Sequence, residues 1–479
     1  MLRASYPANQ RLTKLAAQLL KSRVALYEGT FELHHRGSGR VPGDANWPGK
    51  DKEWNAGKTF NQQAEVEFFL TEAKNAAKIV ADAVQLTENS HKMNPDLPNF
   101  SGWNPYYEMF ASRSLAGYSE ILLWRRYNKE RGIVHLVSHQ LISGTNSGWT
   151  RGLVESFLMK DGKPYYAKTG SYTDATLEDV KKDRDERLSL FLFDEKTPRF
   201  YDTEKREVRA YEFPNMIDKP EVRDVTGYAQ RKYYNYDPAM RAGSEMNDVS
   251  GVPILRASIE ASYELTKTLD ADARKYWDAL RKRAGITGTI DQTIAATDMS
   301  KEANVNRASY DWGAFSAGQP VDKTLYSIRR ERRCEFAGEG MRNEDLVRWC
   351  AMDQVKNYQI EGVNIWTKMY TYPYFIERDK NGNFVKEGGQ YKSRIVADGS
   401  SKSNLSARSL GVYHRPYQII SKENNNVMYD GYTFYLAHYL APVTIQTMEL
   451  CSPTGKVDAS YFYLNINWPT STDKPYALK

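Results

Sequence analysis

The chain has 479 residues, of which 41% are hydrophobic and 26% charged, as expected for a globular protein with one large core or two to three smaller ones. Its 66 basic and 60 acidic residues leave a net charge of +6. The basic clusters are interrupted by acidic residues, so we expect no nucleic-acid partner. Three cysteines without a paired spacing predict neither disulfides nor a zinc site. No apolar run reaches the roughly 18 residues of a membrane helix, and no signal peptide begins the chain, which taken alone favours a cytoplasmic protein.

The N-terminal part predicts two amphipathic helices. Leucine and alanine recur at helical spacing over residues 11–31, and Gly29 is a reasonable stop signal for this helix. A long loop rich in Gly, Pro, Asp, Asn and Trp follows over residues 34–57. A second helix is predicted over residues 63–84, with apolar residues on one side. The two helices resemble a helical-repeat pair of tetratricopeptide type, although the consensus of that repeat is not cleanly present.

The middle of the chain predicts irregular structure with short elements. Residues 94–107 form a loop rich in Pro, Asn and aromatic side chains, and Gly162 marks a hairpin-like turn. A mixed-charge helix is predicted over residues 177–188, and residues 200–248 are irregular, polar and rich in Tyr. Long loops of this kind in a compact protein are usually functional or poorly ordered.

The C-terminal half predicts two further helical regions. Residues 253–283 show helical spacing that is interrupted near residues 268–272, and Gly285 is a typical C-terminal stop. The segment over residues 325–349 is helical on both sides of a Gly-Glu-Gly break. Residues 358–439 are dominated by loops, with Asn, Gly, Ser and Tyr in excess.

These patterns divide the chain into three regions. Residues 1–90 form an N-terminal helical-repeat region, residues 91–250 form a loop-rich central region that is the candidate for ligand binding, and residues 251–479 form a C-terminal region with a further helical repeat. We therefore expect a mostly α fold, in which a tetratricopeptide-like helical-repeat scaffold carries a large irregular, loop-rich region.

One segment of the C-terminal region is unusually dense in charge. It reads RRERRCEFAGEGMRNEDLVRW from Arg329 to Trp349. Arg and Glu at three- and four-residue spacing support a helix through ion pairs, and the planar guanidinium of Arg suits paired carboxylates. We expect a partly buried ion network that joins two helices at the Gly338–Gly340 corner, because nothing nearby supplies a nucleophile.

The same segment resembles the SusD/RagB family. The family pattern ERR-x-EF-x-GE-x-x-R-x-x-DL-x-RW is matched here by Glu331, Arg332, Arg333, Glu335, Phe336, Gly338, Glu339, Arg342, Asp345, Leu346, Arg348 and Trp349. Weaker stretches agree in the same order along the chain. Among them are residues 148–164, residues 184–188 with Glu186 in place of the family's proline, and residues 439–443.

The resemblance implies both a fold and a function. Members of this family are non-catalytic lipoproteins on the surface of the Bacteroidetes outer membrane, with a tetratricopeptide-like scaffold. They capture glycans, or sometimes peptides, and cap a SusC-like TonB-dependent transporter. The resemblance therefore implies a glycan or other nutrient oligomer as ligand, a transporter as partner, and a surface-exposed location.

The beginning of the chain departs from the family pattern. Family members start with a secretion signal, a lipid-anchoring Cys and several helices before the stretch that resembles residues 11–31. We expect this chain to lack that N-terminal part. Membrane attachment would then occur only through a lipid anchor that is absent from this chain.

Catalytic and metal-binding patterns do not emerge from the sequence. His135 and His139 lie four residues apart but lack the Glu of an HExxH motif. Residues 379–383 read Asp-Lys-Asn-Gly-Asn, but a calcium loop of EF-hand type needs Gly at its sixth position rather than its fourth, so a hairpin turn is predicted. We expect no catalytic residue, no metal and no cofactor.

Aromatic residues in polar loops are the candidates for ligand binding. Aromatic side chains make up 13% of the chain, and sugars stack their apolar faces on such rings while polar groups bind their hydroxyls. The candidate ligand-binding residues are Trp103, Asn146, Trp149, Arg151, Tyr165 and Tyr166. A packing role within the loops fits each of them at least as well. Two other functions stay open, a glycan-active enzyme and a helical-repeat scaffold for protein–protein contacts.

Overall fold

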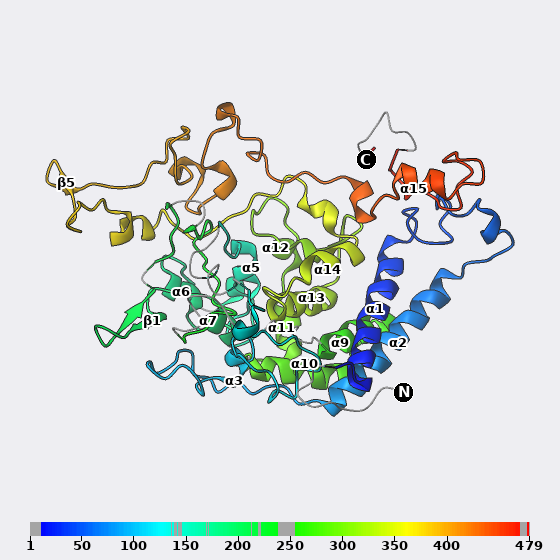
Figure 1. Cartoon of the computed structure of the whole chain (residues 1–479), viewed down its shortest axis with the longest axis horizontal. Coiled ribbons are helices and arrows are strands. Elements are labelled where there is room, and N and C mark those ends of the chain that lie inside the picture. The colour runs from blue at the N-terminus through cyan, green and yellow to red at the C-terminus, as the bar shows by residue number, and fades with distance from the viewer. Residues whose placement is uncertain are drawn as a thin grey trace.

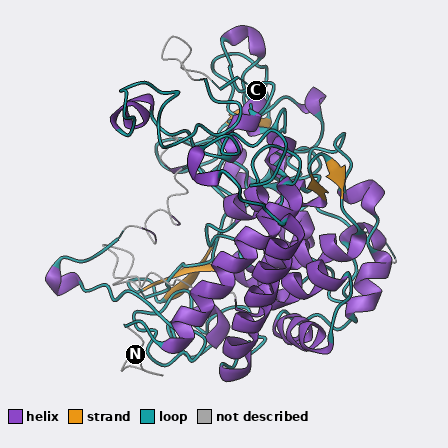
Figure 2. Cartoon of the chain, turned by 90° about the vertical axis from the view of Figure 1, so that its right-hand side faces the viewer, coloured by secondary structure: helices purple, strands orange, loops and turns teal. Residues whose placement is uncertain are grey.

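The structure, a computed structural model, describes residues 11–135, 137, 141, 146–168, 170, 172–211, 213–218, 222–237, 254–469 and 477–478. The fold is mostly α, as predicted, and Figure 2 shows helices gathered in the body of the molecule with loops and a few short strands around them. Helices of seven or more residues in this part of the chain are α1 Lys14–His35, α2 Gln62–Ala83, α9 Ile254–Thr266, α10 Ala271–Arg283, α11 Ile290–Ala296, α13 Lys323–Glu335 and α14 Arg342–Arg348.

The remaining elements are short and lie between long loops. The shorter helices are α3 Pro105–Glu108, α5 Arg151–Ser156, α6 Leu177–Lys181, α7 Glu186–Phe191, α12 Met299–Glu302 and α15 Ile445–Leu450. Antiparallel strand pairs are β1 Pro198–Asp202 with β2 Glu207–Ala210, β3 Phe315–Ser316 with β4 Gln319–Pro320, and β5 Lys386–Glu387 with β6 Gln390–Tyr391. Single 3-10 turns occur within the loops, for example at Pro373–Phe375.

Helices α1 and α2 run side by side in opposite directions as a helical hairpin (Figure 1). The Thr13 side chain caps α1 by accepting a hydrogen bond from the Ala16 N–H (3.0 Å). The Asn61 side chain caps α2 in the same way, accepting from the Ala64 N–H (3.1 Å). The helices predicted from apolar spacing in this part of the chain are therefore confirmed, with their ends shifted by a few residues.

Gly29 does not end α1, contrary to expectation, and the helix continues to His35. Gly29 lies where the two helices approach closely. A Cβ atom at this position would lie 3.0 Å from Leu70 Cδ2 and 3.1 Å from Phe69 Cβ. The residue is therefore small because the neighbouring helix leaves no room, rather than because the chain must reverse.

Helices α9, α10 and α13 extend this hairpin into a larger helical body. Helix α9 packs on α2, and both α10 and α13 pack on α9. A shared apolar core contains Val80, Ile259, Trp277, Leu280 and Ile328, which come from the four helices α2, α9, α10 and α13. The predicted break between α9 and α10 is confirmed. The resulting stack of helical hairpins is the tetratricopeptide-like scaffold that the sequence predicts.

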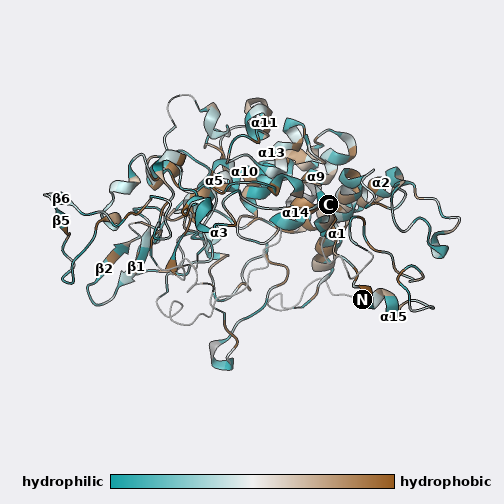
Figure 3. Ribbon diagram, turned by 90° about the horizontal axis from the view of Figure 1, so that it is seen from above, coloured by the Kyte–Doolittle hydropathy of each residue, from teal (hydrophilic) through white to brown (hydrophobic). Residues whose placement is uncertain are grey.

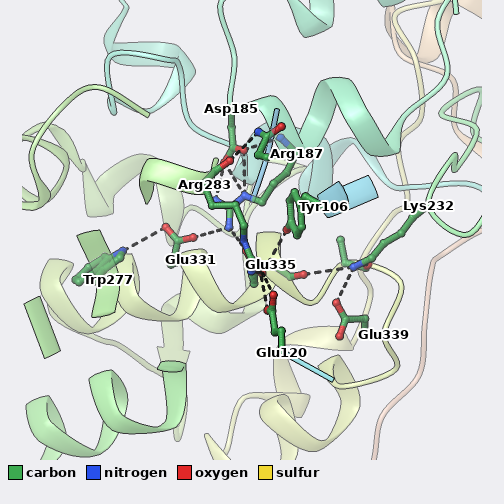
Figure 4. A network of polar contacts seen from close by, with 12 residues as sticks. Tyr106, Glu120, Asp185, Arg187, Lys232, Trp277, Arg283, Glu331, Glu335 and Glu339 are labelled. Atoms are coloured by element: carbon green, nitrogen blue, oxygen red, sulfur yellow. Dashed lines mark hydrogen bonds and ion pairs between the residues drawn. The ribbon is translucent and has the colours of Figure 1, made fainter. Parts of the chain in front are cut away.

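A buried ion network connects α13 to distant parts of the chain (Figure 4). The Glu335 carboxylate accepts hydrogen bonds from Arg187 Nη1 (2.6 Å) and Arg283 Nη2 (2.6 Å). Arg187 Nη1 also donates to Glu331 (2.5 Å), and Arg283 Nη1 donates to Glu120 (2.8 Å). Burying charges costs free energy that their pairing only roughly offsets. The loss of one partner would therefore leave a buried charge uncompensated.

The Gly338–Gly340 corner joins α13 to α14, and both of its glycines have positive φ angles, 77° and 76°. Across this corner, Arg332 Nε donates to Asp345 Oδ2 (2.7 Å). Arg348, at the end of α14, donates to Glu260 of α9 (2.6 Å). The predicted ion network that joins two helices at this corner is confirmed, and Arg348 also ties α14 to α9.

The helix predicted over residues 177–188 is divided into α6 and α7, which corrects the sequence-based boundary. Between the two helices, Arg184 turns inward and its Nη2 donates to the carbonyl oxygens of Val154 (2.8 Å) and Phe157 (2.6 Å). Asp185 then caps α7 by accepting from a backbone N–H of its first turn (2.9 Å). The break follows from contacts with residues distant in sequence.

The loops of the central region fold onto a second core, which they share with residues of the C-terminal region such as Val363 and Phe375. This core is rich in aromatic side chains, among them Tyr106, Tyr107, Phe191, Tyr228 and Tyr234, all almost completely buried. The β5–β6 hairpin projects at one end of the molecule, and α15 lies at the other (Figures 1 and 3). The division of the chain into three regions stays a prediction.

All three cysteines are free thiols. Cys334 and Cys350 are buried, and burial raises the pKa of both thiols, whereas Cys451 is half-buried directly after α15. Within the part of the chain that the structure describes, no helix combines the length and the apolar character needed to cross a bilayer.

Candidate functional site

Trp103 and Trp149, predicted as platforms for sugar stacking, are both core residues. Trp103 is 4% exposed and packs on Tyr107 with ring centroids 4.6 Å apart. Trp149 is 5% exposed and stacks on Phe157 at 5.7 Å with nearly parallel rings. Protein atoms therefore cover most of the surface of both rings. The physical reason is that these loops fold onto a shared core, so polar neighbours in the sequence do not keep an aromatic ring at the surface.

Trp149 also borders a cavity of about 290 Å³ beside the α13–α14 corner, together with Arg332, Phe336 and Arg342. Its indole Nε1 already donates to Gln230 Oε1 (3.0 Å). The cavity is slightly smaller than the range of roughly 300–1,000 Å³ typical of small-molecule sites. It is therefore a weaker candidate than the pocket described below.

Arg151 and Tyr165 belong to one ion cluster. Arg151 donates from Nε to Glu155 (2.7 Å) and from Nη1 to Glu361 (2.7 Å). Arg307 joins the cluster by donating from Nη2 to Glu155 (3.1 Å) and to the Tyr165 hydroxyl (2.5 Å). The two predicted residues are thus brought together, but their polar groups bind protein partners.

Asn146 and Tyr166 lie in separate networks. Asn146 is exposed, and its Oδ1 accepts from Arg223 Nη2 (3.1 Å). The Tyr166 hydroxyl donates to Glu302 Oε1 (2.8 Å). The structure therefore does not gather the six predicted residues into one site. Their contact with a ligand stays a prediction.

A larger pocket lies between the β1–β2 hairpin and the loop that follows residue 371. Its volume is about 690 Å³, well within the usual range for ligand sites. We call it the aromatic pocket. Its lining residues are Glu195, Arg199, Tyr211, Phe213, Asn215, Tyr372, Pro373, Tyr374, Ile376, Glu377, Arg378 and Arg394.

Two half-buried tyrosines, Tyr372 and Tyr374, form one wall of the aromatic pocket. The ring of Phe213 lies 5.2 Å from that of Tyr372 and 5.7 Å from that of Tyr374. Phe375 is 1% exposed and anchors this segment beneath the pocket, where its ring contacts Phe213 at 5.4 Å. Pro373, at the start of a 3-10 turn, separates the two tyrosines and fixes the backbone between them.

Carboxylates hold both tyrosine hydroxyls in place. The Tyr372 hydroxyl donates to Glu195 Oε1 (2.8 Å), and the Tyr374 hydroxyl donates to Asp218 Oδ2 (2.8 Å). Arg394 Nη2 donates to the other oxygen of Asp218 (2.8 Å). Burial, reinforced by these carboxylates, raises the pKa of both tyrosines, so the hydroxyls stay neutral donors at physiological pH. The rings are thus positioned before any ligand arrives.

Charged groups of both signs surround the tyrosine wall. Arg199, Arg378 and Arg394 line the aromatic pocket together with Glu195 and Glu377. Glu377 is paired with Lys392 (3.1 Å) outside the lining. Aromatic faces beside guanidinium and carboxylate groups can accept the apolar face of a sugar ring while hydrogen bonding its hydroxyls.

The pocket tyrosines were missed in the sequence, although a signal for them exists. Residues 370–375 read Tyr-Thr-Tyr-Pro-Tyr-Phe, with four aromatic side chains in six positions of a loop. A proline within such a run prevents regular burial on one helix face. The other wall, from Phe213 and Glu195, is distant in sequence, and no local pattern would have joined it to this run.

The fold is that of a helical-repeat protein, in which a mostly helical scaffold bears loops that line the aromatic pocket. The model of the SusD family matches residues 135–448 of this chain, and the chain belongs to that family. The family assignment made from the segment Arg329–Trp349 is confirmed. No curated protein matches the chain.

Several solved structures resemble the chain. A SusD-like protein from Bacteroides fragilis is 20% identical, with 76% of this chain and 59% of that one covered and a TM-score of 0.45. A SusD-like carbohydrate-binding protein from the same species is 18% identical, with 71% and 62% covered and a TM-score of 0.41. A structure solved with a xylogluco-oligosaccharide is 14% identical, with 91% and 70% covered and a TM-score of 0.36. The chain spans about three fifths of the length of the first two.

Proposed function

We propose that this protein binds a glycan in the aromatic pocket, without catalysing a reaction, and delivers it to a SusC-like TonB-dependent transporter at the cell surface. The observation that carries the proposal is the preformed wall of Tyr372 and Tyr374, whose hydroxyls are fixed by carboxylates. Because these side chains are already ordered, binding loses less conformational entropy. Membership of the SusD family supports a nutrient ligand rather than a reaction.

Calorimetric titration with a panel of neutral and acidic oligosaccharides tests the binding site. Tyr372→Ala and Tyr374→Ala should each weaken binding of the recognised oligosaccharide at least tenfold, or about 1.4 kcal/mol. Tyr461→Ala is the matched control, because Tyr461 is 62% exposed and does not line the pocket. Thermal melts confirm that all variants are folded. The proposal fails if the wild type binds no member of the panel, or if both pocket variants bind as the wild type does.

Chromatography of the incubated oligosaccharide tests the absence of catalysis. We expect its chain length to stay unchanged, and the release of shorter products would instead favour a glycan-active enzyme.

Cross-linking on intact native cells tests the partner. It should join the protein to a TonB-dependent transporter, and recovery of the protein without that transporter would contradict the delivery step.

A further inference from the structure

An exposed pair of aromatic rings lies on the hairpin that contains β5 and β6. Phe384 is 37% exposed and Tyr391 is 55% exposed. Their ring centroids are 5.6 Å apart, and the ring planes are inclined by 69°. Large apolar surface left in water is unfavourable, and grouped exposed aromatics commonly mark interaction sites. The pair therefore requires an explanation beyond the packing of the body of the protein.

The aromatic pair is continuous with the aromatic pocket through Arg378. This arginine lines the pocket, and its guanidinium lies 4.1 Å from the centroid of the Phe384 ring. Arg378 and Phe384 are also directly paired across an antiparallel bridge. Side chains of directly opposed residues lie on the same face of the two strands. Phe384 therefore stands on the face of the hairpin that borders the pocket.

A hydrogen-bonded turn maintains this continuity. The Asp379 carboxylate accepts from the N–H groups of Asn381 (2.8 Å) and Asn383 (2.9 Å), which confirms the hairpin turn predicted for residues 379–383. Arg378 Nη1 donates to the Gly382 carbonyl oxygen (2.8 Å), so the turn also fixes the arginine. The ring of Phe384 is thus brought back over a side chain that belongs to the pocket wall.

From this continuity we infer that Phe384 and Tyr391 form a second subsite, which binds further sugar residues of a glycan chain that extends out of the aromatic pocket. The inference rests on the proposed function of that pocket. The ligand class is an oligosaccharide longer than the pocket alone can hold. Two cations flank the rings: Arg378 lies over Phe384, and the Lys386 ammonium lies 5.0 Å from the centroid of the Tyr391 ring. Both can donate hydrogen bonds to sugar hydroxyls.

An alternative role for the pair is purely structural, because neighbouring aromatic side chains stabilise hairpins. The two roles differ in how affinity depends on ligand length. A structural pair would affect short and long oligosaccharides alike. A second subsite would affect only those that are long enough to reach it.

Titration with a length series separates these roles. The probes are linear gluco-oligosaccharides with β-1,4 or α-1,4 linkages and the corresponding manno- and xylo-oligosaccharides, each from two to six units. In the recognised series, wild-type affinity should rise with length. The double variant Phe384→Ala/Tyr391→Ala should bind the shortest ligand as the wild type does and lose at least tenfold for the longest. The double variant Phe384→Tyr/Tyr391→Phe keeps both rings and should retain the gain with length.

Three outcomes would overturn the inference. They are a wild-type affinity that does not depend on length, a length gain that survives in the alanine double variant, and an equal loss at all lengths in that variant. In each of these cases the aromatic pocket still binds the shortest ligand in the wild type, so its proposed function stands. If no series binds to the wild type, both proposals fail together.

Discussion

At the scale of single residues, Glu32 on α1 is an unfavourable charge that the fold tolerates. Its side chain is buried, and its Oε2 has no hydrogen-bond partner. Burial, followed by the negative charges of Glu28 and Glu65, raises the pKa of Glu32 to about 7. A carboxyl whose pKa is higher in the folded state binds more protons there. Stability therefore falls as the pH rises from the ordinary carboxyl value to about 7.

The variant Glu32→Gln should remove this dependence on pH. We expect it to raise the free energy of unfolding by about 1 kcal/mol at pH 8, once solvent screening is allowed for, and to change little at pH 4.5, where the wild-type carboxyl is already neutral. Denaturant unfolding at the two pH values measures the effect. Glu67→Gln, at an exposed position of α2, is the control. A variant that gains the same stability at both pH values would contradict this account.

At the scale of elements, helix α13 depends on residues outside itself. Glu335→Gln keeps the shape of the side chain but leaves Arg187 and Arg283 without full compensation. Breaking one partner of a buried charge network costs about 3–5 kcal/mol. We expect a loss of this size in chemical denaturation. Glu178→Gln is the matched control, because its pair with Lys196 is exposed and should contribute less than about 1 kcal/mol.

The elements differ in how far the sequence predicts them. Helices α1 and α2 follow from apolar spacing, which is a local signal. The break between α6 and α7 does not, because Arg184 leaves the helix to bind carbonyl groups of Val154 and Phe157. The local sequence also does not explain Gly29, because this residue is small to make room for Leu70 of another helix. Local signals therefore place the helices, while contacts between them decide where some helices end.

The candidate site was less predictable than the scaffold. Trp103 and Trp149 carry the right chemistry, but burial depends on how whole loops fold together, and both rings end in the core. The aromatic residues around Tyr372 and Tyr374 stand out in the sequence by their composition. Their contact with Phe213 could not be predicted, because Phe213 lies in a separate part of the chain. Residue type can thus be read from a sequence more reliably than exposure in a loop-rich region.

At the scale of the whole molecule, the β5–β6 hairpin stands apart from the body (Figure 1). The residues at its tip, Gly388 and Gly389, are exposed, and so are Lys386 and Lys392 on either side of them. Exposed tips of this kind are preferred sites of proteolysis. In brief digestion with trypsin, we expect this hairpin to be cleaved well before the α1–α2 hairpin, as mapped by mass spectrometry of the fragments.

A variant with Lys386→Gln and Lys392→Gln should slow the early cleavage in the hairpin while leaving later fragments unchanged. Early cleavage within α1 or α2 would contradict the expectation that the helical body resists trypsin longer than the projecting hairpin does. A bound oligosaccharide that reaches Tyr391 should also protect the hairpin, since Tyr391 directly precedes Lys392 and is paired with Lys386 on the opposite strand.

The unequal burial of the three cysteines gives the protein a natural attachment point. Thiolates are the reactive form, and burial of Cys334 and Cys350 both raises their pKa and blocks reagents, which leaves Cys451 as the accessible thiol. Cys451 follows α15, at the opposite end of the molecule from the β5–β6 hairpin (Figure 1). Maleimide coupling of the unaltered protein should therefore immobilise it in one orientation, with the aromatic pocket directed away from the support.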